Sequence, residues 1–171
     1  MAIQLSDHFT YRRLLRFVWP PITMMIFTSI YGVVDGIFVS NFAQDGAFAG
    51  LNLIYPVIMI VGGVGFMIGT GGSALVSKLL GEQEKERANQ VFSMMVIFTA
   101  IFGAIISVIG SLLIKPIALA LASVGEGNTE NMIKYAIIYG RILMLGQVTF
   151  MLQNLFQSFF VVAEKPQLGF I

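Results

Sequence analysis

Apolar residues gather in four long runs that short polar segments separate. The runs cover about 17–42, 51–77, 91–114 and 133–163. Each run is long enough to cross a hydrocarbon layer, because a helix needs about 20 apolar residues to do so. The sequence therefore predicts an all-α integral membrane protein, with four transmembrane helices forming a bundle over 17–163 after a polar N-terminal segment, 1–16.

The third apolar run ends at a proline. Lys115 and Pro116 follow it directly, and a proline removes a helical hydrogen bond and favours a break. The next apolar stretch, 117–124, is too short to span a membrane. We expect it to form a separate short helix at the membrane interface.

Basic residues are distributed unevenly between the two sides of the predicted bundle. One side carries Arg12, Arg13, Arg16, Lys78, Lys85, Arg87 and Lys165, and the other carries Lys115 and Lys134. Short loops rich in Lys and Arg stay in the cytoplasm. The pattern predicts a cytoplasmic N-terminus in the plasma (inner) membrane and a return of 164–171 to the cytoplasm. Arg141, inside the fourth run, reaches the outer interface or forms an ion pair in the bundle.

Composition excludes several classes of function. Hydrophobic residues make up 57% of the chain and charged residues 11%, and the formal net charge is +1. This leaves no basic surface for nucleic acid. Cysteine is absent and His8 is the single histidine, so neither thiolate chemistry nor a histidine metal site is expected. We predict a protein that is not an enzyme and needs no cofactor, with membrane lipid among its partners.

Small residues crowd two of the runs. The second contains Gly65-x-x-x-Gly69, and the third places Gly103, Ser107 and Ser111 four residues apart. Such faces let helix backbones approach closely, and frequent glycine also permits bending. The pattern favours close packing, with flexing of a helix as the alternative. Self-association between chains through these glycine-rich faces is a further expectation.

Asp35 carries the single charge between Arg16 and Asp45. An acid near the middle of a membrane helix costs about 2.5–3.5 kcal/mol, so such residues usually serve a partner, a cation or a proton. Proton or sodium binding would neutralise the side chain and change which helix packing is favoured. The alternative is a structural carboxylate that bonds Tyr31, Asn41 or a backbone group.

Uncharged polar residues line one face of the fourth run. Gln147, Asn154 and Gln157 are seven and three residues apart, a spacing that returns to one side of a helix. Buried amides hold neighbouring helices together, or they line a water-filled cavity. With Tyr31 they are candidate cavity-lining residues.

Several segments resemble the multidrug and toxic compound extrusion family. They include Pro20-Pro21, Tyr31-Gly32-Val33-Val34-Asp35-Gly36 and Tyr55-Pro56, and the resemblance continues through Ala74 to Glu82 and into the last run. It implies an antiporter that exports organic cations or other amphipathic compounds in exchange for sodium ions or protons. Asp35 then matches the carboxylate that helps to form the family's cation site, and no other metal site is implied.

Members of that family have twelve spans in two lobes, so the four spans here correspond to the N-terminal third, and 164–171 would lead into a fifth span. In the family, the partners of the Asp35 carboxylate come largely from the fifth and sixth spans. Two alternatives remain. One is a flippase for lipid-linked saccharides, for which Arg141 is the one candidate pyrophosphate ligand. The other is a four-helix membrane subunit without transport activity.

Overall fold

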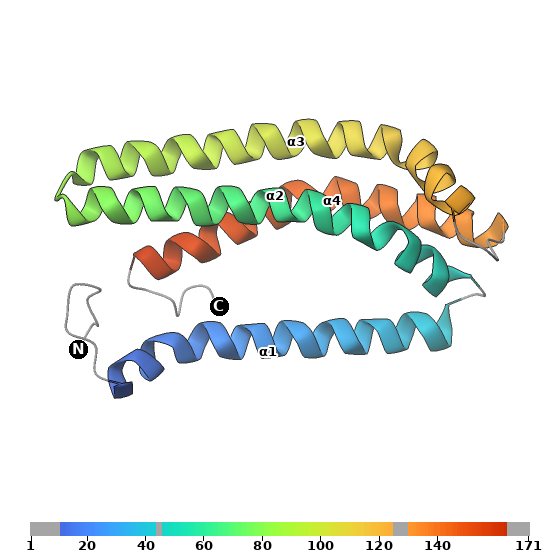
Figure 1. Cartoon of the computed structure of the whole chain (residues 1–171), viewed down its shortest axis with the longest axis horizontal. Helices are drawn as coiled ribbons and strands as arrows, with labels where there is room; N and C mark the ends of the chain where they lie inside the picture. Colours follow the sequence, from blue (N-terminus) through green and yellow to red (C-terminus); the bar gives the residue numbers. More distant parts are fainter. Residues whose placement is uncertain (1–10, 44–45, 125–129, 164–171) are drawn as a thin grey trace.

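The computed structural model describes residues 11–43, 46–124 and 130–163, and these form four long helices (Figure 1). In chain order they are α1 (Tyr11–Phe42), α2 (Ala47–Gly81), α3 (Lys85–Val124) and α4 (Glu130–Val162). Each is long and apolar enough to cross a membrane. The predicted all-α membrane fold is confirmed. Residues 1–10 and 164–171, which belong to the two predicted cytoplasmic ends, lie outside the described residues.

The helices are longer than the apolar runs that predicted them. α1 already begins at Tyr11, within the segment predicted to be a polar N-terminal end, 1–16. The 40 residues of α3 rise by about 60 Å, twice the thickness of a hydrocarbon layer. Parts of the helices must therefore extend beyond the apolar layer.

The expected break at Pro116 was wrong. α3 continues through Pro116 to Val124 without interruption, although its last turns change direction (Figure 1). A proline inside a long helix removes one backbone hydrogen bond, and the helix bends rather than ends when packing holds both halves. Ile114 and Ala118, on either side of Pro116, are both fully buried. Their packing explains why the helix survives.

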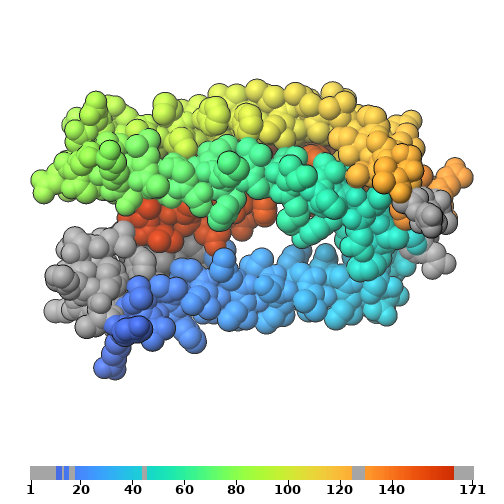
Figure 2. Space-filling model, viewed as in Figure 1, coloured from blue at the N-terminus to red at the C-terminus, as the bar shows by residue number. Residues whose placement is uncertain are grey.

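Three of the helices form a packed bundle, and α1 lies beside it. The core at one end of the bundle contains Ile54 from α2, Ile114 from α3 and Met144 from α4. At the other end it contains Val76, Ala88, Leu155 and Phe159. α1 meets α2 near their connecting turn and runs along the bundle with an open space between (Figures 1 and 2). Its most apolar stretch has no buried residue.

The glycine faces of α2 and α3 are close-packing surfaces. Gly62, Gly65, Gly69 and Gly72 of α2 and Gly103 of α3 are buried. A Cβ atom on Gly65 would lie 2.6 Å from Cγ of Met151, and one on Gly72 would lie 2.4 Å from Cε of Met95. Flexible methionine side chains thus fill the notches that glycine leaves. Close packing, the favoured reading of the pattern, is what the structure contains.

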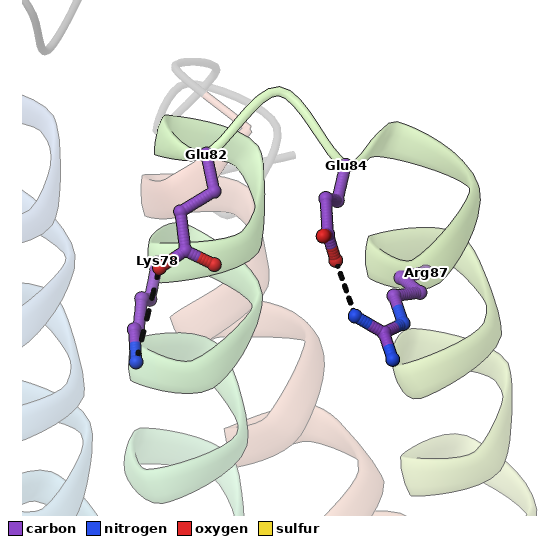
Figure 3. Close-up of polar contacts among 4 residues, drawn as sticks. All are labelled: Lys78, Glu82, Glu84 and Arg87. Atoms are coloured by element: carbon purple, nitrogen blue, oxygen red, sulfur yellow. Dashed lines mark hydrogen bonds and ion pairs between the residues drawn. The ribbon is translucent and has the colours of Figure 1, made fainter.

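The turn between α2 and α3 takes only three residues. The Gln83 N–H donates to Leu80 O at 3.1 Å and the Glu84 N–H to Leu79 O at 2.9 Å, which is the Schellman arrangement at a helix end. Gln83 has φ of 63°, a left-handed conformation that usually requires glycine. Two ion pairs flank the turn, Lys78–Glu82 at 3.8 Å and Arg87–Glu84 at 2.8 Å (Figure 3).

We expect Gln83→Gly to stabilise the protein. Left-handed backbone costs a residue with a Cβ about 1–2 kcal/mol, and glycine avoids this cost but loses more backbone entropy on folding. The net gain should be about 0.5–1 kcal/mol in the free energy of unfolding, measured by SDS titration of the protein in detergent micelles. Gln83→Val, which adds a β-branched side chain at the same φ, should lower that free energy. Equal effects of the two variants would contradict the strain argument.

Candidate functional site

Asp35 lies on α1 without a partner among the described residues. Its side chain is exposed and makes no hydrogen bond or ion pair with them. Tyr31, one turn earlier, is 70% exposed. The Asn41 amide, considered as a partner from the sequence, donates instead to Ile37 O at 2.8 Å and to Ser40 Oγ at 3.2 Å. The reading of Asp35 as a structural carboxylate held by its own helix therefore has no support here.

The side of α1 that carries Asp35 is turned towards the bundle. Met24 lies on that side, because its Sδ accepts a hydrogen bond from Gln157 Nε2 of α4 at 3.3 Å. Asp35 comes eleven residues after Met24. Eleven residues make three full helical turns plus about 20°, so the two side chains point in nearly the same direction. The two side chains thus share a face of α1. Figure 2 shows the open space between this helix and the bundle.

The level of Asp35 along the bundle follows from the same contact. α1 and α4 run in opposite directions (Figure 1), so three turns back along α4 from Gln157 bring the chain to about Gly146. Gly146 is exposed, and nothing lies within 4 Å of the position that a Cβ would take there. The carboxylate is therefore opposite a stretch of α4 that leaves room for a ligand.

One of the predicted cavity-lining amides, Gln157, contacts α1, and a second, Asn154, lies one turn away from it on α4. Gln157 is half-buried and contacts Met24. Asn154 comes one turn before Gln157, is also half-buried, and donates from Nδ2 to Phe150 O of its own helix at 2.8 Å. Its Oδ1 and the Gln157 Oε1 are neutral acceptors of the kind that cations use.

Gln147 occupies a different place from the other two amides. It is 2% exposed and sits between α2 and α4, where Nε2 donates to Ile58 O at 3.3 Å. Its Oε1 has no hydrogen-bond partner in the described part of the chain. Gln147 therefore holds α2 and α4 together, which was the alternative to lining a cavity. It does not face the space beside α1.

The sequence reading missed one polar residue in the core. Thr99 of α3 is fully buried, and its Oγ1 has no partner among the described residues. Thr99, Gly103 and Ser107 are spaced four residues apart. The Ser107 hydroxyl donates to Met144 O at 2.5 Å. Extending the four-residue spacing one step towards the N-terminus would have identified it.

Arg141 lies away from the space beside α1. It is exposed on α4 and forms no ion pair within the described part of the chain. Arg141 and Gln157 are sixteen residues apart, which places them about 160° apart around the helix. The reading of Arg141 as a side chain that reaches the membrane interface fits this position, and an ion pair with Asp35 does not.

Carboxylates do not cluster at this site. Among the described residues, no group of three or more His, Cys, Asp or Glu side chains could hold a metal ion. A cation at Asp35 would therefore combine one carboxylate with neutral oxygens. Sodium accepts such a mixture, and a proton needs only the carboxylate.

Comparison with known proteins identifies the family. The family model described as MatE matches residues 20–171, which include Asp35 and nearly all of the four helices. The chain belongs to the MatE family. No solved structure matches the chain.

Three relatives show how much of a MatE protein the chain represents. It is 24% identical over 116 residues to the multidrug export protein MepA of Staphylococcus haemolyticus, covering 68% of this chain and 26% of the relative. It is 26% identical over 133 residues to the probable multidrug resistance protein YoeA of Bacillus subtilis, covering 78% and 28%. For MepA of Staphylococcus saprophyticus the values are 23% over 137 residues, 79% and 30%. The chain thus spans less than a third of each of these relatives.

Proposed function

We propose that this MatE chain is part of an ion-coupled exporter of small amphipathic or cationic compounds. The observation that carries the proposal is the position of Asp35, a carboxylate without a partner among the described residues, on the bundle-facing side of α1 beside an open space. The names of the relatives, which refer to multidrug export and resistance, support the substrate class. Such a protein would work in the plasma membrane with its N-terminus in the cytoplasm.

In the proposed mechanism, Asp35 alternates between a charged and a neutralised state. A lone carboxylate in an apolar layer is costly when charged, so a proton or a sodium ion that neutralises it lowers the cost of closing α1 against α4. Tyr31, one turn from Asp35, supplies a hydroxyl oxygen close to the carboxylate for a sodium ion. Asn154 and Gln157 lie about two to three turns farther along the bundle and supply polar groups for a substrate. Release of the ion restores the charge and favours the open arrangement.

The test is Asp35→Asn in the complete exporter that contains this chain, expressed in a bacterial host that lacks its own exporters. We expect efflux of a cationic dye to fall at least tenfold while the amount of protein in the membrane stays unchanged, because asparagine cannot lose a proton or neutralise a cation. Glu82→Gln, which removes a negative charge from the exposed α2–α3 turn, should leave efflux intact. Undiminished efflux by the Asp35→Asn variant would refute the proposal. Collapsing the sodium and proton gradients separately would identify the coupling ion.

The flippase alternative is weaker on structural grounds. A pyrophosphate group needs cationic side chains in the transport space, and Arg141 lies on the opposite side of α4 from α1. The subunit alternative predicts that the chain has no transport activity and works by binding another protein. Self-association would have to use open glycines such as Gly63 and Gly71, because the buried ones already pack within the chain.

A further inference from the structure

Three basic residues lie near one end of the bundle, remote from the α2–α3 turn. They are Lys115 of α3 and Lys134 and Arg141 of α4, which we call the cationic patch. All three are exposed, and none pairs with an acidic side chain among the described residues. The α2–α3 turn differs, since there Lys78 and Arg87 each pair with a glutamate.

The packing of α3 against α4 places the patch residues on one side of these two helices. Gly140 and Ile114 are in contact, with Cγ1 of Ile114 only 2.6 Å from the position that a Cβ on Gly140 would take. The two helices run in opposite directions. The residue that follows Ile114 on α3 and the residue that follows Gly140 on α4 therefore lie on the same side of the helix pair. Lys115 and Arg141 are these next residues. Lys134 precedes Arg141 by seven residues, two turns, and joins them.

This side of the pair faces away from α2. Ile54 of α2 packs against the buried Gly140, next to Ile114, whereas the neighbouring Arg141 is exposed. Met95 of α3, which covers Gly72 of α2, lies about 160° around α3 from Lys115. The cationic patch is therefore free of the rest of the described bundle.

The patch marks the edge of the apolar layer. Neither α3 between Arg87 and Lys115 nor α4 from Arg141 to its end at Val162 contains another charged residue. Lys115 and Arg141 thus stand at the same end of the uncharged stretch, at the depth of lipid headgroups. Farther into the layer on the same side, Val108, two turns from Lys115, is 57% exposed, and Leu145, about one turn from Arg141, is 62% exposed.

We infer that the cationic patch binds the phosphate of an anionic membrane lipid, with Val108 and Leu145 contacting the acyl chain. The arrangement has the two parts that a lipid requires, cations at headgroup depth and exposed apolar side chains beneath them. Arg141 offers a planar fork for two phosphate oxygens, and Lys115 adds a second positive charge from the other helix. This inference does not depend on Asp35 or on transport.

Native mass spectrometry of the purified chain tests the inference. The probes are phosphatidylglycerol and phosphatidylcholine with identical acyl chains, added to the protein in detergent. We expect phosphatidylglycerol to bind more tightly, and the double variant Lys115→Gln/Arg141→Gln to lose this preference. Since a basic residue near a membrane surface contributes roughly fivefold to the binding of anionic lipid at low salt, the loss should exceed about tenfold. Arg141→Lys, which keeps the charge, should retain most of the preference.

The matched control is Lys78→Gln/Lys85→Gln, which removes the same charge at the α2–α3 turn. It should bind phosphatidylglycerol like the original chain, and an equal loss in this control would overturn the inference by showing an effect of net charge alone. Equal binding of the two lipids by the original chain would overturn it as well. Displacement of the lipid by millimolar inorganic phosphate would show that the site takes free phosphate and would reject the lipid assignment.

Discussion

Replacing Gly50 with alanine should separate α2 from α4 at one end of the bundle. A Cβ on Gly50 would lie 2.6 Å from Met132 O and 2.9 Å from Ala136 N, both backbone atoms of α4. Backbone cannot move aside as a methionine side chain can, so the helices must shift. Overpacking of this kind costs about 1–3 kcal/mol. We expect a loss of that size in the free energy of unfolding, measured by SDS titration and circular dichroism.

The control for Gly50→Ala is Gly63→Ala on the same helix. Nothing lies within 4 Å of the position of a Cβ on Gly63, and alanine is the better helix former by about 1 kcal/mol. The control should therefore raise the free energy of unfolding, so the two variants are expected to differ in sign. A gain in stability for both would contradict the packing of α2 against α4.

The helices themselves could be predicted from the sequence because their signal is local. Four apolar runs of membrane length give four helices whatever their neighbours, and the small-residue spacing around Gly65 and Gly103 correctly indicated close packing. Helix ends were harder to place. The backbone in the 3-residue turn at Gln83 and the continuation of α3 past Pro116 depend on contacts with other helices, such as the burial of Ile114 and Ala118.

The candidate site could be predicted only in part. Asp35 stood out because its charge is costly in an apolar run, and Asn154 and Gln157 were predicted to share a helical face, of which Gln157 contacts α1. The same face pattern could not separate Gln147 from them. Gln147 and Asn154 are seven residues apart, which leaves them about 20° apart around the helix. Gln147 is nonetheless buried and bonds to α2, whereas Asn154 is half-buried and bonds within its own helix. Which helix covers which turn is a property of the tertiary packing.

Replacing Gln147 with glutamate should destabilise the bundle strongly at pH 8. Gln147 is 2% exposed, and its Nε2 donates to Ile58 O. The substitution removes this donor and places a carboxylate against a carbonyl oxygen in a site that has no cation among the described residues. A buried charge without a partner costs about 3–5 kcal/mol, and we expect a loss of that order in the free energy of unfolding.

The effect of Gln147→Glu should be reversed in part by acid. The penalty falls on the charged form in the folded state, so stability is lost as the pH rises through the carboxyl's titration and regained as the pH falls. At pH 5 the protonated carboxyl can again donate to Ile58 O. Gln90→Glu, on an exposed position near the polar α2–α3 turn, should show neither the loss nor the recovery. Gln147→Leu should stay within about 1 kcal/mol of the original chain, because it removes the unpaired Oε1 together with the hydrogen bond. A matching loss in Gln90→Glu would contradict the enclosed position of Gln147, since the effect would then follow from the added charge alone and not from burial between α2 and α4.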